Sequence, residues 1–283
     1  MLYKELEKIL IEERARGLQD IYILNLLKEY LQVYALYFIY TNSKYNKNLI
    51  FTGGTCLRHF YNLPRLSEDI DFEFKENFDR KILLDDLEEY FKKRYKYNKI
   101  KLSLKQRGDQ ILLKFPVLHK LGLAEEDKSN LLFVKLDFSK NLSKHLNLET
   151  TSKSIYGFNF AAVHYDLPSL MSGKIHAILV RKRFKGINNA EVIRGRDYFD
   201  LLWFLKKSIR PNLKRLSEML GTGISMNFLV KQLDLKVKEI VRKHKSFLKS
   251  DLVPLISDPD FIKIYVDNYY EEYMRNRKNL FQK

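Results

Sequence analysis

Hydrophobic side chains recur at helical spacing in two stretches at the start of the chain. Leu2, Leu6 and Leu10 predict a first helix, and residues 20–40 predict a longer second helix that is apolar over much of its circumference. The second stretch contains Lys28 and other polar residues, whereas a membrane span needs about 18 or more residues with few or no charges. We therefore expect a buried helix and no membrane association.

Strict alternation of polar and apolar residues marks the segment Asp69-Ile-Asp-Phe-Glu-Phe74. A period of two predicts a strand, because successive side chains of a strand point to opposite faces. Asp69, Asp71 and Glu73 should therefore share one face of this strand, and the three apolar residues should share the other.

A compact group of short elements precedes this strand. Residues 48–52 predict a short buried strand, Gly53-Gly54 predicts a turn, and residues 55–61 predict a helix for which Thr55 is a possible N-cap. Arg65 and Ser67 lie in the loop that follows.

The rest of the chain changes character near residues 152–157. Before that boundary we expect a helix at 79–95 and strands at 100–105, 110–115 and 131–138, and after it a strand at 159–165. Beyond these the pattern predicts helices at 168–183 and 196–207, a polar loop at 185–194 between them, and a helical, basic remainder. These elements predict an α+β fold with a small mixed sheet. Residues 1–155 should hold the N-terminal helices and the core sheet, and residues 156–283 a mostly helical region.

The composition narrows the classes of function. The chain has 51 Lys and Arg against 35 Asp and Glu, a formal charge of +16, which favours a polyanionic partner such as nucleic acid but also suits a merely soluble, lysine-rich surface. Cys56 is the only cysteine, so a disulfide within the chain and a cysteine-based zinc site are excluded. The charged N-terminus does not have the pattern of a signal peptide, and we expect a cytoplasmic protein.

Two carboxylates spaced by two on a strand can reach one hard divalent cation. Mg²⁺ and Mn²⁺ suit such oxygen ligands, and Asp137, in a similar alternating strand, is the best candidate for a third ligand beside Asp69 and Asp71. The turn Gly53-Gly54 opens a helix, where backbone N–H groups can hold a phosphate. By itself, an Asp-x-Asp pair is more often a pair of exposed acids on a strand, and the glycine pair is equally compatible with a tight turn.

The whole string FTGGTCLRHFYNLPRLSEDIDFEF, from Phe51 to Phe74, resembles the first motif of the AbiEii-like (MenT-type) nucleotidyltransferase toxins of type IV toxin–antitoxin and abortive-infection systems. Later segments agree in order: Lys135-Leu-Asp137, the segment around Lys174, and Arg196-Asp197-Tyr-Phe-Asp200-Leu. The resemblance covers about residues 50 to 205 and implies a polymerase-β-like nucleotidyltransferase core.

The resemblance also implies roles for individual residues. Asp69 and Asp71 would be catalytic and hold metal, Lys174 would be catalytic and contact the phosphates of a nucleoside triphosphate, and Asp197 would complete the active site as base or as orienter of Lys174. The nucleotide would be bound by these residues: Gly53, Gly54, Thr55, Arg65, Ser67 and Lys174. Without the resemblance, Lys174 is compatible with a solvated helix residue and Asp197 with an acid at a helix N-terminus.

The implied reaction moves a nucleoside monophosphate to an acceptor, with tRNA or another RNA expected first and a separately encoded antitoxin as a further partner. Residues 174–215 carry twelve Lys and Arg against three Asp and Glu, and within them the loop 181–196 is the better candidate for RNA contact. Two alternatives remain open: a protein or small-molecule acceptor, and a catalytically silent RNA-binding protein of the same fold.

Overall fold

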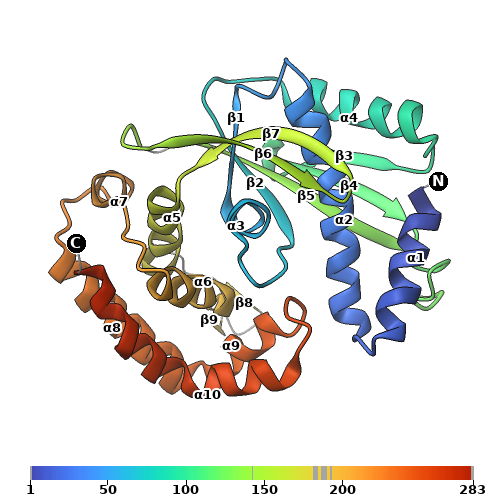
Figure 1. The fold of residues 1–283 in the computed structure, drawn as a ribbon. Helices are drawn as coiled ribbons and strands as arrows, with labels where there is room; N and C mark the ends of the chain where they lie inside the picture. Colours follow the sequence, from blue (N-terminus) through green and yellow to red (C-terminus); the bar gives the residue numbers. More distant parts are fainter. Residues whose placement is uncertain (1, 142, 181–183, 186–189, 192, 282–283) are drawn as a thin grey trace. The chain divides into compact units, whose positions relative to one another are not determined.

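A computed structural model describes residues 2–141, 143–180, 184–185, 190–191 and 193–281 (Figure 1). The chain divides into two compact units. The sheet unit comprises Met1–Asn141 and Glu149–His164, and the helical unit comprises Leu142–Leu148 and Tyr165–Lys283. No helix among the described residues is long and apolar enough to cross a membrane.

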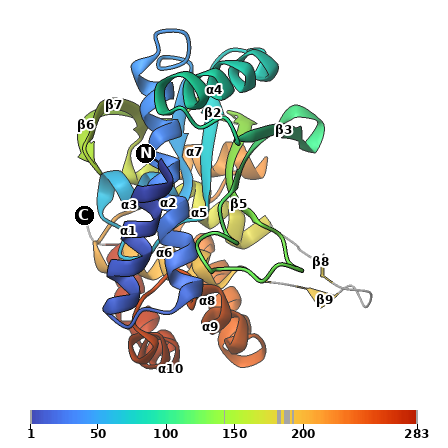
Figure 2. The same cartoon turned by 90° about the vertical axis from the view of Figure 1, so that its right-hand side faces the viewer.

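The sheet unit begins with two helices that run side by side (Figure 2), α1 (Leu2–Ala15) and α2 (Asp20–Thr41). Leu2, Leu6 and Leu10 of α1 are buried, as their spacing predicts. Helix α2 also buries polar residues, among them Glu29 and Gln32, whose side chains contact other parts of the unit.

A seven-stranded mixed sheet follows in the order β3-β4-β5-β2-β1-β7-β6. Its strands are β1 (Leu49–Thr52), β2 (Asp69–Phe74), β3 (Lys101–Lys105), β4 (Gln110–Pro116), β5 (Leu131–Lys140), β6 (Leu148–Ile155) and β7 (Phe158–Tyr165). Strand β2 lies between β1, to which it is antiparallel, and β5, to which it is parallel. The predicted α+β fold with a mixed sheet is confirmed.

One face of this sheet is apolar and is covered by α2, α3 (Gly53–Tyr61) and α4 (Arg80–Tyr95). Tyr40 of α2 contacts Phe72 of β2, and Phe91 of α4 contacts Phe115 of β4. Phe60 of α3 contacts Phe51 of β1. Because Phe72 lies on this covered face, the alternation of β2 directs its acidic residues to the opposite face.

The helical unit is built from α5 (Leu167–Val180), α6 (Gly195–Lys206), α7 (Leu213–Leu220), α8 (Met226–Lys243), α9 (Lys245–Leu252) and α10 (Pro259–Asn276), with a short hairpin of β8 (Phe184–Lys185) and β9 (Ala190–Glu191) and a final 3₁₀ turn, η2 (Arg277–Leu280). Helix α6 starts against α9, where a Cβ on Gly195 would lie 2.6 Å from the Leu248 Cα. Asn212 and Ser225 accept hydrogen bonds from backbone N–H groups in the first turns of α7 and α8.

The expectations from sequence differ from the structure at several points. Thr55 is wrong as an N-cap: α3 begins two residues earlier, and the Thr55 hydroxyl donates to the carbonyl of Asp69 at 2.5 Å. Strand β6 was not predicted. The division of the chain into two domains after residue 155 stays a prediction. Strand β7 belongs to the sheet unit as far as His164, which pairs with Phe51 of β1.

Candidate active site

The acidic face of β2 lies beside Asp137 of β5 inside the sheet unit. The register pairs Asp69 with Lys135 and Asp71 with Asp137, so the three carboxylates sit on two adjacent parallel strands. Neighbouring residues in register point to the same face of a sheet. The structure therefore places on one face of two neighbouring strands the three acids that the sequence selected as metal ligands.

The backbone carbonyl and the side chain of Asp69 each have a partner. Its backbone carbonyl accepts the Thr55 hydroxyl, and the Lys135 ammonium lies 3.4 Å from its Oδ1 atom. This distance is within ion-pair range, but the contact is not a hydrogen bond, and Oδ1 is a buried oxygen that accepts none from the described residues. A buried carboxylate oxygen without a donor has spare capacity for a cation.

Asp71 lies directly against the start of α3. Gly53 has φ 75°, and a Cβ placed there would lie 1.9 Å from the Asp71 Oδ2 atom. A side chain is therefore excluded on two grounds, the left-handed backbone and the adjacent carboxylate. The close approach puts the first N–H groups of a nine-residue helix beside the acidic face.

Arg65 and Ser67 lie against the second glycine of the pair. A Cβ on Gly54 would lie 2.8 Å from Ser67 Oγ and 3.1 Å from Arg65 Nη2. Both side chains are buried, and Arg65 also donates from Nη1 to the carbonyl of Leu66 at 2.8 Å. Asp71, Ser67 and Arg65 of the first motif therefore all lie against the Gly53-Gly54 start of α3. Thr55, in the first turn of this helix, is fully buried.

Two residues outside the predicted set support this arrangement. Gln32 of α2 donates from Nε2 to the carbonyls of Ser67 at 3.1 Å and Glu68 at 2.9 Å. Gln110 of β4 donates to Asp137 Oδ1 at 2.6 Å. Nothing in the local sequence signals either contact, because Gln32 lies 35 residues from Ser67 and Gln110 lies 27 residues from Asp137.

The oxygen-rich face fits a divalent cation that also uses phosphate oxygens from a substrate. Mg²⁺ is usually bound by one or two carboxylates together with such phosphates. Over the described ranges, no group of three or more His, Cys, Asp or Glu side chains is placed to hold a metal by itself. Asp69, whose Oδ1 accepts no hydrogen bond, and Asp71 are compatible with a cation that is bound by two carboxylates and by substrate phosphates.

A second cluster lies in the helical unit and contains the other two predicted residues. The Lys174 ammonium of α5 lies 3.1 Å from Asp197 Oδ1 and 2.7 Å from Asp200 Oδ2, both on α6. The side chains are 15%, 6% and 0% exposed, respectively. Residues three apart on a helix share a face, which explains how two acids of α6 reach one lysine. Asp200 belongs to the motif that the sequence singled out, but it was not assigned a role there.

The predicted RNA-binding loop 181–196 falls largely outside the described residues. Only the hairpin backbone of β8 and β9 and residues 193–196 are described within it.

A mixed sheet whose central strands carry these acids beside a Gly-Gly helix start has the architecture of a nucleotidyltransferase. The family described as "Nucleotidyl transferase AbiEii toxin, Type IV TA system" matches residues 35–264 of the sequence. The chain therefore belongs to the AbiEii nucleotidyltransferase toxin family, and it is a transferase enzyme.

Solved structures agree with this fold. MenT4, a nucleotidyltransferase toxin from Mycobacterium tuberculosis H37Rv, is similar with a TM-score of 0.52 and 14% identity over 96% of this chain and 89% of that one. JHP933 from Helicobacter pylori is similar with a TM-score of 0.50 and 16% identity over 91% and 93%. A search of curated proteins finds no significant match.

Proposed function

We propose that this enzyme uses a divalent cation to transfer a nucleoside monophosphate from a nucleoside triphosphate to RNA, with tRNA as the acceptor. The observation that carries the proposal is the packing of Asp71 against Gly53. It puts a carboxylate for a cation and backbone donors for phosphate at one place. The family supports nucleotidyl transfer and the toxin role, while metal and RNA belong to the proposal.

In this proposal Asp69 and Asp71 hold Mg²⁺ or Mn²⁺, with Asp137 as a further ligand. When bound, the cation supplies charge neutralisation on the phosphates. The N–H groups at Gly53 and Gly54 bind phosphate oxygens. Ser67 and Arg65 complete the binding of the nucleotide, and Thr55 supports the site through its hydrogen bond to the Asp69 carbonyl.

The proposed transfer exchanges one bond at the α-phosphorus of the nucleoside triphosphate for another. A hydroxyl oxygen of the acceptor forms a bond to the α-phosphorus, and the bond from that phosphorus to the oxygen shared with the β-phosphate breaks. Pyrophosphate leaves with the electron pair of that bond, and the hydroxyl proton is released to the solvent. Catalysis would rest on positioning and on stabilisation of charge, as is usual for such transfers.

Lys174, Asp197 and Asp200 are proposed to serve the same reaction. A lysine is a compact point charge suited to phosphate, and its two partner acids would fix its position. The formal charge of +16 supports a polyanionic acceptor. As a member of a toxin–antitoxin family, the enzyme is proposed to act on tRNA in the cytoplasm until a cognate antitoxin counters it.

The test is to incubate the purified protein with total tRNA, Mg²⁺ and each labelled nucleoside triphosphate in turn, beside an Asp71→Ala variant. The proposal predicts that label enters RNA with the wild type and not with the variant. Label in protein or in a small molecule would keep the enzyme and reject the RNA acceptor. No transfer to anything, without metal-dependent nucleotide binding, would point instead to a catalytically silent RNA-binding protein.

A further inference from the structure

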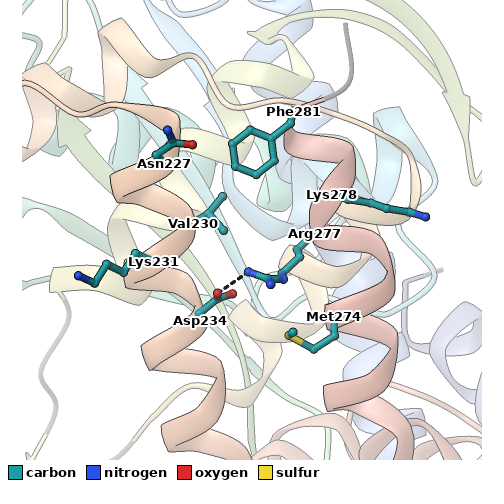
Figure 3. Close-up of a pocket in the computed structure, with 8 residues that line it drawn as sticks. All are labelled: Asn227, Val230, Lys231, Asp234, Met274, Arg277, Lys278 and Phe281. Atoms are coloured by element: carbon teal, nitrogen blue, oxygen red, sulfur yellow. Dashed lines mark hydrogen bonds and ion pairs between the residues drawn. The ribbon is translucent and has the colours of Figure 1, made fainter.

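A groove lies between the last helices of the helical unit, outside the residues assigned to catalysis (Figure 3). Its volume is about 450 Å³, within the range of roughly 300–1,000 Å³ typical of ligand sites. Residues of α8 line one side, and residues of α10, η2 and the following position line the other. The lining residues are Asn227, Val230, Lys231, Asp234, Met274, Arg277, Lys278 and Phe281.

The groove carries more positive than negative charge. Its one acid, Asp234, is paired with Arg277 and also accepts a hydrogen bond from the Tyr273 hydroxyl at 2.8 Å. Lys231 and Lys278 are exposed and have no carboxylate partner within the described part of the chain. Figure 3 shows the two side chains extending from opposite edges of the groove, with their ammonium groups directed away from its centre. Two unneutralised cations therefore flank a space whose only acid is already satisfied.

The space between these cations is partly apolar and includes an aromatic ring. Phe281 is 50% exposed, and its ring faces the groove above the buried Val230, while Met274 lines the other end of the groove. A flat base can stack on such a ring, and base–aromatic stacking is worth about 1–3 kcal/mol per base. An exposed aromatic flanked by cations is the combination that proteins use to bind single-stranded nucleic acid.

We propose that this groove binds an unpaired nucleotide of the RNA acceptor, with its base on Phe281 and the adjoining phosphates on Lys231 and Lys278. This inference rests on the proposed function, because the groove would bind the same RNA acceptor at a second place, outside the active site. Cations on opposite sides suit the successive phosphates of a strand better than the single phosphate group of a free nucleotide. The aromatic ring favours a base over an acidic peptide.

The test measures binding of a fluorescent, unstructured RNA oligonucleotide to the full chain by anisotropy, without nucleoside triphosphate or metal. Phe281→Ala should weaken binding by roughly 5- to 150-fold, and Phe281→Tyr should restore it. Lys231→Gln and Lys278→Gln should each weaken binding and lower the salt dependence by about 0.7 in the logarithmic slope. Lys249→Gln, an exposed lysine of α9 outside the groove, makes the same charge change and should have no effect.

The outcomes separate this inference from the proposed enzyme activity. Metal-dependent binding of nucleoside triphosphate should be unchanged in the groove variants, because the groove lies outside the residues assigned to catalysis. Equal affinity in wild type and all groove variants would overturn the inference and leave the groove to a protein partner, while transfer activity would be unaffected. Displacement of the oligonucleotide by about a hundredfold excess of AMP would reassign the groove to a free nucleotide and reject the strand.

Discussion

Replacing Gly53 by alanine should lower both the rate of nucleotide transfer and the stability of the protein. The residue has φ 75°, and the new Cβ would lie 1.9 Å from Asp71 Oδ2 and 2.8 Å from Asp71 Cβ. Real contacts of a Cβ are not shorter than 3.0 Å, so the carboxylate must move by about 1 Å (from 1.9 Å to at least 3.0 Å) or the helix start must shift by as much.

Two magnitudes follow from this geometry. The left-handed backbone alone costs an alanine about 1–2 kcal/mol in the free energy of unfolding. A displacement of about 1 Å at a reacting centre costs about 100-fold in rate. Gly53→Ala should therefore lower the rate of nucleotide transfer by about two orders of magnitude and the stability by about 1–3 kcal/mol.

Gly17→Ala is the matched control for this variant. Its φ of 79° imposes the same backbone strain, but no described atom lies within 4 Å of the added Cβ. Urea unfolding should show a similar loss of stability from strain in both variants, while only Gly53→Ala loses transfer of labelled nucleotide to tRNA. Transfer by Gly53→Ala within threefold of the wild type would refute the claim that Asp71 must sit against this helix start.

Further predictions concern other parts of the molecule. Lys174→Ala should abolish transfer and lower the free energy of unfolding by up to about 3–5 kcal/mol. The reason is that the buried carboxylates of Asp197 and Asp200 would lose the ammonium group with which they pair. Adding Asp200→Asn should recover part of that stability in urea titrations but no activity. Gln32→Leu should lower kcat without preventing folding, because the carbonyls of Ser67 and Glu68 would lose the hydrogen bonds that Gln32 donates just before Asp69. An unchanged kcat would contradict the role of Gln32 in positioning Asp69. Burial lowers the pKa of His59 to about 4, below the 6.5 of the unfolded chain, so the unfolded state takes up the proton first as pH falls below 6.5. Stability should therefore fall between pH 6.5 and 4, by about 2 kcal/mol at pH 5, and the fall should be smaller in His59→Phe.

The sequence predicted the parts of the site that depend on local pattern. Strand β2 has the predicted bounds, because a strict period of two over six residues allows one pleated arrangement. Strand β6 was missed because its segment, LETTSKSI, is largely polar on both faces and its burial shows no apolar side to detect.

The supporting contacts could not be predicted in the same way. The hydrogen bond from Gln110 to Asp137 and that from Thr55 to the Asp69 carbonyl join segments whose pairing depends on the fold. Local sequence suggested that Thr55 would cap the helix that it enters, which is a common role for threonine. Its hydroxyl instead stabilises the next strand, because α3 begins at Gly53 against Asp71.

The most direct test of the central claim is calorimetric titration of each nucleoside triphosphate into the protein, with Mg²⁺ and then with EDTA. The wild type should bind one nucleotide at least tenfold more tightly with Mg²⁺, and a variant carrying Asp69→Asn and Asp71→Asn should lose that difference while remaining folded. Nucleotide binding of equal affinity with Mg²⁺ and with EDTA, or an unchanged metal effect in the double variant, would contradict the assignment of the cation to these two carboxylates.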